Sequence, residues 1–219
     1  MKKKEKITIG VLNHNENIFN SFFSKSIMKL KNNYEIIIKK NLKPAIAFNE
    51  IIVESKNDYI LFVHADVLFD DYFMQSLEKS IKLFPDFGAM GVVGVIKPFL
   101  KKKKYIKSSS FNNPCVTTLD SCCILINKNH NLKFDEIKFD EFHHFIEDYC
   151  MQVKYDLKLK IYLISANFYC DTLNTGSKQL KNYFYHGSST IKEQGSRWGN
   201  WLHYKKILDK KWGRKVITT

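Results

Sequence analysis

Short apolar runs alternate with helically spaced segments through the first hundred residues of the chain. The apolar runs predict strands at Ile7–Leu12, Tyr34–Ile38, Tyr59–Val63 and Ala89–Ile96. Apolar positions spaced by three and four residues predict the intervening helices, at Asn17–Leu30, Pro44–Asn57 and Tyr72–Leu83. Such alternation is typical of a mostly parallel sheet with helices on both faces, so the pattern predicts an α/β fold.

The second half of the chain has a different pattern. Lys97–Asn113 is polar and rich in lysine, which predicts a loop. The elements predicted after it are a strand interrupted by Asp120, a helix and a further strand, at Thr117–Ile126, Phe142–Leu157 and Lys160–Ile164. We see no internal repeat and no linker that would divide the chain, so we expect a single domain.

Near its end the chain carries aromatic and aliphatic residues at helical spacing. They are Trp201, Tyr204, Leu208 and Trp212. Intervals of three and four residues place side chains on one face of a helix, and we expect this face to pack on the domain. The alternative is an interfacial helix that its tryptophans and lysines hold at an anionic membrane.

Polar residues stand where predicted strands end. Asn13 and His14 follow the first strand, and Asp66 follows the third. In an open α/β sheet ligands bind beyond the carboxyl ends of the strands, so these residues predict a site there. Asp66 either caps a turn or binds Mg²⁺ or Mn²⁺ that bridges a diphosphate, since hard cations prefer oxygen ligands. His64 lies on the same side of the strand as Asp66 because strand side chains alternate.

A second acidic group lies in "FDEFHHFIEDYC", at Phe139–Cys150. We interpret its first acids, Asp140 and Glu141, as an acid-rich helix start, as we do Asp70 and Asp71 before the preceding helix. Further along, Glu147 or Asp148 could accept a proton from a sugar hydroxyl. Adjacent residues on a helix point about 100° apart, so we do not expect both to perform that role.

Composition narrows the possible partners. The 219 residues carry a formal net charge of +13 at pH 7, which predicts attraction to an anionic ligand, an acidic membrane face or nucleic acid. No recognised nucleic-acid-binding module accompanies the charge, so we expect no nucleic-acid partner. The five cysteines form no C-x-x-C pair, which argues against a disulfide framework or zinc site. With no apolar run near the roughly 20 residues of a membrane-spanning helix, we expect a cytoplasmic protein, peripheral to the membrane at most.

Four stretches in order resemble family 2 glycosyltransferases, and more narrowly the streptomycin-biosynthesis-protein-like branch. They are "AIAFNEIIVES", "ILFVHADVLF", "TLDSCCILINK" and "FDEIKFDEFHHFIEDYCMQ", which begin at Ala45, Ile60, Thr118 and Phe134. The second resembles a reduced form of the DxD motif, with His64 in place of the first aspartate. The resemblance implies a GT-A fold, with a mixed, mostly parallel sheet flanked by helices.

The resemblance also implies roles for individual residues. Asp66 would bind the metal, with His186 as a substitute for the histidine ligand that relatives carry later in the chain. Asp148 would be the catalytic base of an inverting transfer. The residues implied to bind the donor are Asn13, Asn49, His64 and Asp66. Those expected at the acceptor are Asp120, His143 and Glu147.

These observations predict a bacterial, cytoplasmic glycosyltransferase. It would use Mn²⁺ or Mg²⁺ and a nucleotide sugar, most plausibly a UDP-sugar, and transfer the sugar to a surface glycan or lipid-linked acceptor. The expected organisation is a nucleotide-sugar half at 1–100, an acceptor half at 101–180 and a basic aromatic helix at 181–219. The alternative is a relative that binds nucleotide sugars or glycans without catalysis. Two departures favour it: the DxD motif is incomplete, and the aspartate that many relatives carry after the second strand, for the nucleotide base, is missing.

Overall fold

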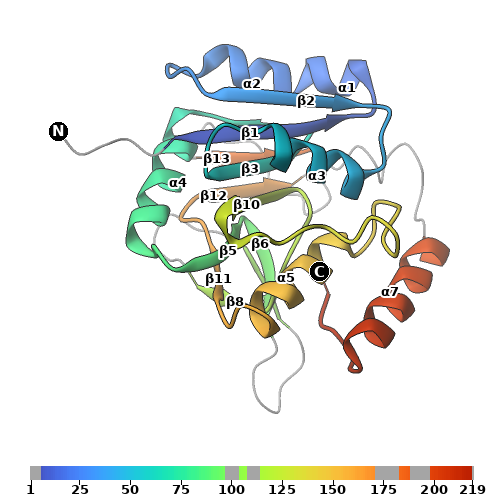
Figure 1. The fold of residues 1–219 in the computed structure, drawn as a ribbon. Coiled ribbons are helices and arrows are strands. Elements are labelled where there is room, and N and C mark those ends of the chain that lie inside the picture. Colours follow the sequence, from blue (N-terminus) through green and yellow to red (C-terminus); the bar gives the residue numbers. More distant parts are fainter. Residues whose placement is uncertain (1–5, 97–103, 108–113, 171–182, 188–197, 219) are drawn as a thin grey trace.

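A seven-stranded sheet lies at the centre of the computed structural model, in the order β2-β1-β3-β10-β5-β11-β8 (Figure 1). The structure describes residues 6–96, 104–107, 114–170, 183–187 and 198–218. The strands of this sheet are β1 (Ile7–Asn13), β2 (Glu35–Lys40), β3 (Tyr59–His64), β5 (Phe87–Gly91), β8 (Cys115–Val116), β10 (Cys123–Asn127) and β11 (Lys160–Leu163). β10 and β8 run antiparallel to their neighbours and the other five strands share one direction, so the sheet is mixed and mostly parallel.

Two smaller sheets flank the central one. One pairs β12 (Asn167–Cys170), β13 (Tyr183–His186) and β4 (Val67–Phe69). The other pairs β7 (Lys104–Lys107), β6 (Val93–Ile96) and β9 (Thr118–Leu119). The first of them connects the turn after β3 with a segment more than a hundred residues later, and this pairing builds the candidate site.

Helices cover both faces of the sheet, as the alternation predicted. They are α1 (Glu16–Ser21), α2 (Phe23–Lys29), α3 (Pro44–Glu54), α4 (Asp71–Leu83), α5 (Phe145–Tyr155) and α7 (Trp198–Trp212), with a short 3₁₀ helix at Lys128–His130. Leu61 and Val63 of β3 pack in the core with α2 and α4, while Ile60 and Phe62 pack with α3 and α5. This alternation follows from the two-residue period of a strand and gives the sheet two separate cores.

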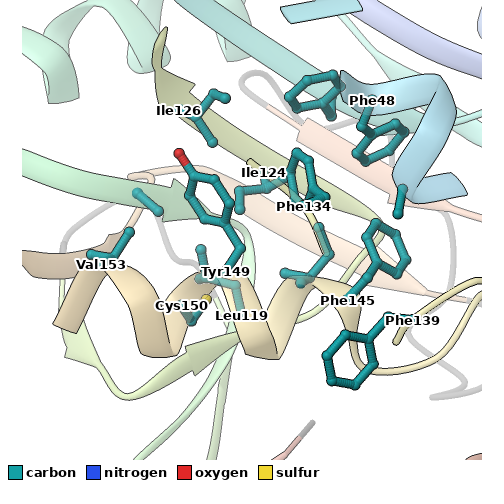
Figure 2. Close-up of a cluster of buried hydrophobic side chains, with 14 of the residues drawn as sticks. Phe48, Leu119, Ile124, Ile126, Phe134, Phe139, Phe145, Tyr149, Cys150 and Val153 are labelled. Atoms are coloured by element: carbon teal, nitrogen blue, oxygen red, sulfur yellow. The ribbon is translucent and has the colours of Figure 1, made fainter. Parts of the chain in front are cut away.

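Aromatic side chains fill the core between the sheet, α3 and α5 (Figure 2). The ring of Phe48 stacks on Phe62 with centroids 4.2 Å apart, and Phe134 meets Phe48 edge-on at 5.4 Å. Burying such a side chain contributes about 1.5–3 kcal/mol, so this cluster fixes α3 and α5 against the sheet. α7 adds Tyr204 and Leu208 to the same core, which confirms the prediction that its apolar face packs on the domain.

Several predicted boundaries are wrong in detail. The predicted helix at Asn17–Leu30 is two helices, because the backbone of Phe22 leaves the helical region at φ −123° and ψ −81°. The predicted strand at Ala89–Ile96 divides into β5 and β6, which belong to different sheets. A Cβ at Gly91 would lie 2.8 Å from the Cys123 carbonyl, so glycine permits the close approach at this division. The predicted loop at Lys97–Asn113 contains β7, and its other residues lie outside the described residues.

The two acids before the fourth helix have the role that the sequence predicted. Asp70 caps α4, where its carboxylate accepts a hydrogen bond from the Phe73 amide at 2.9 Å, and Asp71 lies in the first turn. Both acids therefore begin a helix, as predicted.

Within the part of the chain that the structure describes, every helix is too short or too polar to cross a bilayer.

Candidate functional site

Two histidines converge on a buried aspartate beyond the carboxyl end of β3. His64 ends β3, and Asp66 lies in the turn before β4. β13 pairs antiparallel with β4 so that His186 lies opposite Val67, and the Gly187 amide donates to the Asp66 carbonyl at 2.8 Å. Strand pairing thus fixes His186 beside Asp66, although 120 residues of sequence separate the two.

The side chains of this His64–Asp66–His186 group lie within ligand distance of one another. Oδ1 of Asp66 lies 3.4 Å from Nε2 of His186 and 4.0 Å from Nδ1 of His64. One ligand atom from each residue falls within 4.8 Å of the other two. The predicted metal residues Asp66 and His186 are therefore brought together, with His64 as a third member.

Burial shapes the electrostatics of the group. The Asp66 residue is 1% exposed. Burial lowers the pKa of His64 to about 4, although the negative charge of Asp66 acts in the opposite direction. His64 is therefore neutral near pH 7, and a neutral imidazole is the form that binds a metal ion.

The donor set fits a divalent transition metal. Imidazole and carboxylate together suit Mn²⁺ and its first-row neighbours, whereas Mg²⁺ prefers oxygen ligands and retains water. Three protein ligands would leave coordination positions for phosphate oxygens. Of the two predicted cofactors, Mn²⁺ therefore matches these side chains better than Mg²⁺.

Gly187 leaves little space behind the group. A Cβ at this position would lie 2.9 Å from Cε1 of Phe22 and 3.2 Å from the Asp66 carbonyl oxygen. A larger residue would displace the turn that holds Asp66, so glycine here serves close packing of the site.

A small cavity adjoins His64 at the same end of the sheet. Its volume is about 20 Å³, enough for a water molecule and too small for a nucleobase. The lining residues are Leu12, His14, Pro44, Phe48, Val63, His64, Ala65, Phe142 and Phe145. His14 and Phe142 meet edge-to-face with ring centroids 5.9 Å apart, so separating these rings would enlarge the cavity.

Asn13 and Asp120 lie near this end of the sheet. Asn13 is buried at the end of β1, and its Oδ1 accepts from the Asn15 amide at 3.1 Å. Asp120 accepts from the Cys122 amide at 2.8 Å and is close enough to His64 for its charge to favour the protonated imidazole. The donor role of Asn13 and the acceptor role of Asp120 stay predictions.

Asn49 of α3 is hydrogen-bonded to the segment before α5. Its Nδ2 donates to the Phe134 carbonyl and its Oδ1 accepts from the Phe134 amide, each at 2.9 Å. Nδ2 also donates to Glu136 at 3.1 Å. These bonds attach α3 to the segment before α5, and the donor role of Asn49 stays a prediction.

Asp148 is held by the C-terminal helix. Its carboxylate accepts from Lys211 Nζ and from Trp212 Nε1, both at 2.9 Å, and from Gln152 at 3.1 Å. The residue is fully buried, and Lys211 also binds Asp135 at 2.7 Å. Asp148 as catalytic base stays a prediction, but a buried carboxylate engaged by a lysine and two N–H donors fits a structural ion pair better.

Glu147 has a different partner from Asp148 and meets His144. Nδ1 of His144 lies 3.1 Å from Oε1 of Glu147, and the two side chains are 1% and 7% exposed. His143 lies beside this pair, and its ring centroid is 6.3 Å from that of His144. Sequence reasoning missed His144; the signal that could have found it is the three-residue spacing that brings the residue before a helix to the third helical residue, here Glu147.

Comparison with known proteins gives matches in structure alone. No protein-family model matches the sequence, and no curated protein matches it. TarS 1-349 of S. aureus in complex with UDP-GlcNAc superposes with a TM-score of 0.58 at 13% identity, over 97% of this chain and 68% of that one. A further structure of TarS 1-349 gives a TM-score of 0.57 at 12% identity, over 97% of this chain and 67% of that one.

A second kind of protein has the same fold. GalNAc-T7 with UDP, GalNAc and Mn²⁺ gives a TM-score of 0.60 at 5% identity, over 85% of this chain and 44% of that one. The chain thus spans about two thirds of TarS 1-349 and less than half of GalNAc-T7. These similarities confirm the predicted fold class, the GT-A fold of nucleotide-diphospho-sugar transferases.

Proposed function

We propose that this protein is an inverting glycosyltransferase that moves a sugar from a nucleotide-sugar donor to a hydroxyl group. The observation that carries the proposal is the His64–Asp66–His186 group at the carboxyl end of β3, in a GT-A fold. Two proteins with this fold were solved with UDP-GlcNAc or with UDP, GalNAc and Mn²⁺. Those complexes favour a UDP-sugar donor here.

His64, Asp66 and His186 would hold the cation, and Mn²⁺ suits them best. When bound, the cation offsets negative charge on the departing diphosphate. Asn13, at the end of β1, would lie against the nucleotide. The cavity between His14 and Phe142 would open to admit part of the donor, because its present 20 Å³ cannot hold a base.

Inversion requires that the acceptor oxygen attack the anomeric carbon from the face opposite the diphosphate. The attacking hydroxyl then loses a proton, so a base must lie on that side. Glu147, His143 and Asp120 are our proposed acceptor-side residues. The net charge of +13 favours an anionic acceptor, such as a phosphorylated glycan or a lipid diphosphate at the inner face of a bacterial membrane.

The second candidate is a relative that binds a nucleotide sugar and no longer transfers it. Its supporting observation is the environment of Asp148, whose carboxylate is occupied by Lys211 and Trp212. His64 in place of the first DxD aspartate favours it as well. A binding protein and an enzyme would both bind the donor and differ in turnover.

Calorimetry separates these possibilities. We expect the wild-type protein to bind one member of a UDP-, GDP- and CMP-sugar panel, and to bind it at least tenfold more weakly without Mn²⁺. Asp66→Asn should show the weaker affinity under both conditions. Release of nucleoside diphosphate then distinguishes enzyme from binding protein. Equal affinity of Asp66→Asn and wild type in Mn²⁺ would refute the proposed site.

A further inference from the structure

The second histidine of the Phe142–Phe145 segment has an unusual backbone conformation. His144 precedes the first turn of α5 at φ 65° and ψ 3°, in the left-handed region. Non-glycine residues adopt this conformation at a cost and are concentrated at functional sites. The conformation therefore prompts the question of what the imidazole does there.

Its side chain forms a carboxylate–imidazole dyad with Glu147. The 3.1 Å contact joins His144 Nδ1 to Glu147 Oε1. If Glu147 is ionised its carboxylate can only accept, so Nδ1 of a neutral His144 would be the donor and Nε2 would present the lone pair. Nε2 is buried and has no hydrogen-bond partner within the described residues. The dyad is thus arranged to take up one proton at Nε2, with Glu147 stabilising the resulting imidazolium.

The dyad lies on the segment that walls the cavity beside the metal group. Phe142 and Phe145, on either side of it in the sequence, both line the cavity that His14 and His64 also line. Trp201 of α7 covers the His144 ring edge-on, with centroids 4.9 Å apart. An acceptor sugar could replace this tryptophan contact and reach Nε2.

The neighbouring Asp148 lacks this freedom. It lies in the first turn of the helix that His144 precedes, yet Lys211 and Trp212 donate to its oxygens. The oxygens of Asp148 are thus already occupied by donors, whereas Nε2 of His144 has no hydrogen-bond partner among the described residues. Between the two candidates for a base on α5, the contacts favour the dyad.

We infer that His144 is the catalytic base of the transfer, with Glu147 as its positioning residue; this inference rests on the proposed function. The acceptor O–H bond breaks as its oxygen bonds to the anomeric carbon, and the proton passes to His144 Nε2. The bond from the anomeric carbon to the diphosphate oxygen breaks, and the diphosphate leaves with that electron pair. The imidazolium then releases its proton to solvent.

The test uses release of nucleoside diphosphate with water as acceptor, in Mn²⁺, across the nucleotide-sugar panel. His144→Asn keeps a side chain that tolerates positive φ, so the fold should persist. We expect its kcat to fall about 100-fold or more, the usual contribution of a general base, with donor Kd unchanged within threefold. His203→Gln, on the exposed face of α7, is the matched control and should retain wild-type kcat.

Chemical rescue distinguishes proton transfer from a merely structural role. His144→Gly suits the left-handed backbone and leaves a space the size of an imidazole. Added imidazole should raise the kcat of this variant at least tenfold and should leave Asp66→Asn inactive. The inference about His144 alone would be overturned if His144→Asn kept the wild-type kcat. It would also be overturned if added imidazole failed to raise the kcat of His144→Gly. Failure of the wild type to release diphosphate from any donor would overturn the proposed enzyme and this base together.

Discussion

Two fully buried aspartates lie in contrasting surroundings. Asp66 faces the imidazoles of His186 and His64, at 3.4 and 4.0 Å. Asp148 faces the ammonium of Lys211 and the indole N–H of Trp212, both at 2.9 Å. The first carboxylate is placed to share a cation, whereas the second already has one. Burial alone therefore does not distinguish the two acids. The side chains that each carboxylate contacts do: imidazoles for Asp66, and an ammonium and an indole N–H for Asp148.

The largest expected effect is at Asp148. Asp148→Asn should lower the free energy of unfolding by roughly 3 kcal/mol, because removal of one partner leaves Lys211 half-buried and undercompensated. Urea denaturation without metal ion measures the loss. The double variant Asp148→Leu with Lys211→Met should recover most of it, since apolar replacement of a buried pair is often neutral. A single variant as stable as wild type would contradict a structural role.

The second effect separates the two aspartates by their response to metal. Mn²⁺ at a hundred times its Kd should stabilise the wild-type protein by about 2.7 kcal/mol, because the ion binds the native state. Asp66→Asn should lose this stabilisation while Asp148→Asn retains it. Thermal denaturation with and without Mn²⁺ provides the measurement. Equal Mn²⁺ responses of the two variants would mean that the ion binds elsewhere.

A pH dependence follows from His64. Its folded-state pKa of about 4 lies below the ordinary 6.5, so between these values the unfolded chain binds more protons than the native protein. Stability therefore falls as the pH is lowered from about 6.5 to about 4, by on the order of 2 kcal/mol. His64→Gln should flatten this part of the curve in metal-free buffer. An unchanged slope would show that other groups produce it.

The architecture was predictable because its strands are strong local signals. Buried runs such as Tyr59–Val63 have no competing interpretation in a sequence that alternates them with amphipathic helices. Among the strands that were missed, β4 and β13 are three and four residues long and pair with each other across the sequence. Such short segments carry no periodic pattern, and their pairing is decided by tertiary structure.

The candidate site was predictable in part for the same reason. Asp66 stands at the end of a strong strand, and the resemblance to glycosyltransferases suggested His186. The roles of Glu147 and Asp148 could not be assigned from sequence, because adjacent helix residues face different neighbours. Only the position of α7 decides that Asp148 meets Lys211, whereas Glu147 meets His144, three residues before it in the sequence.

The smallest expected effect lies in a third carboxylate, Asp140, which shares the acid-rich segment with Asp148 but lies at the surface. Lys43 donates to it at 2.6 Å, and the two side chains are 50% and 39% exposed. Lys43→Met should change the free energy of unfolding by at most about 0.5 kcal/mol, because water already solvates both charges. Urea denaturation at low and high salt measures it, with Lys211→Met as the buried counterpart. If Lys43→Met lowered the free energy of unfolding as much as Lys211→Met, exposure would not determine how much these ion pairs contribute to stability. The contrast between Asp66 and Asp148 would then need a cause other than the partners that each meets in the interior.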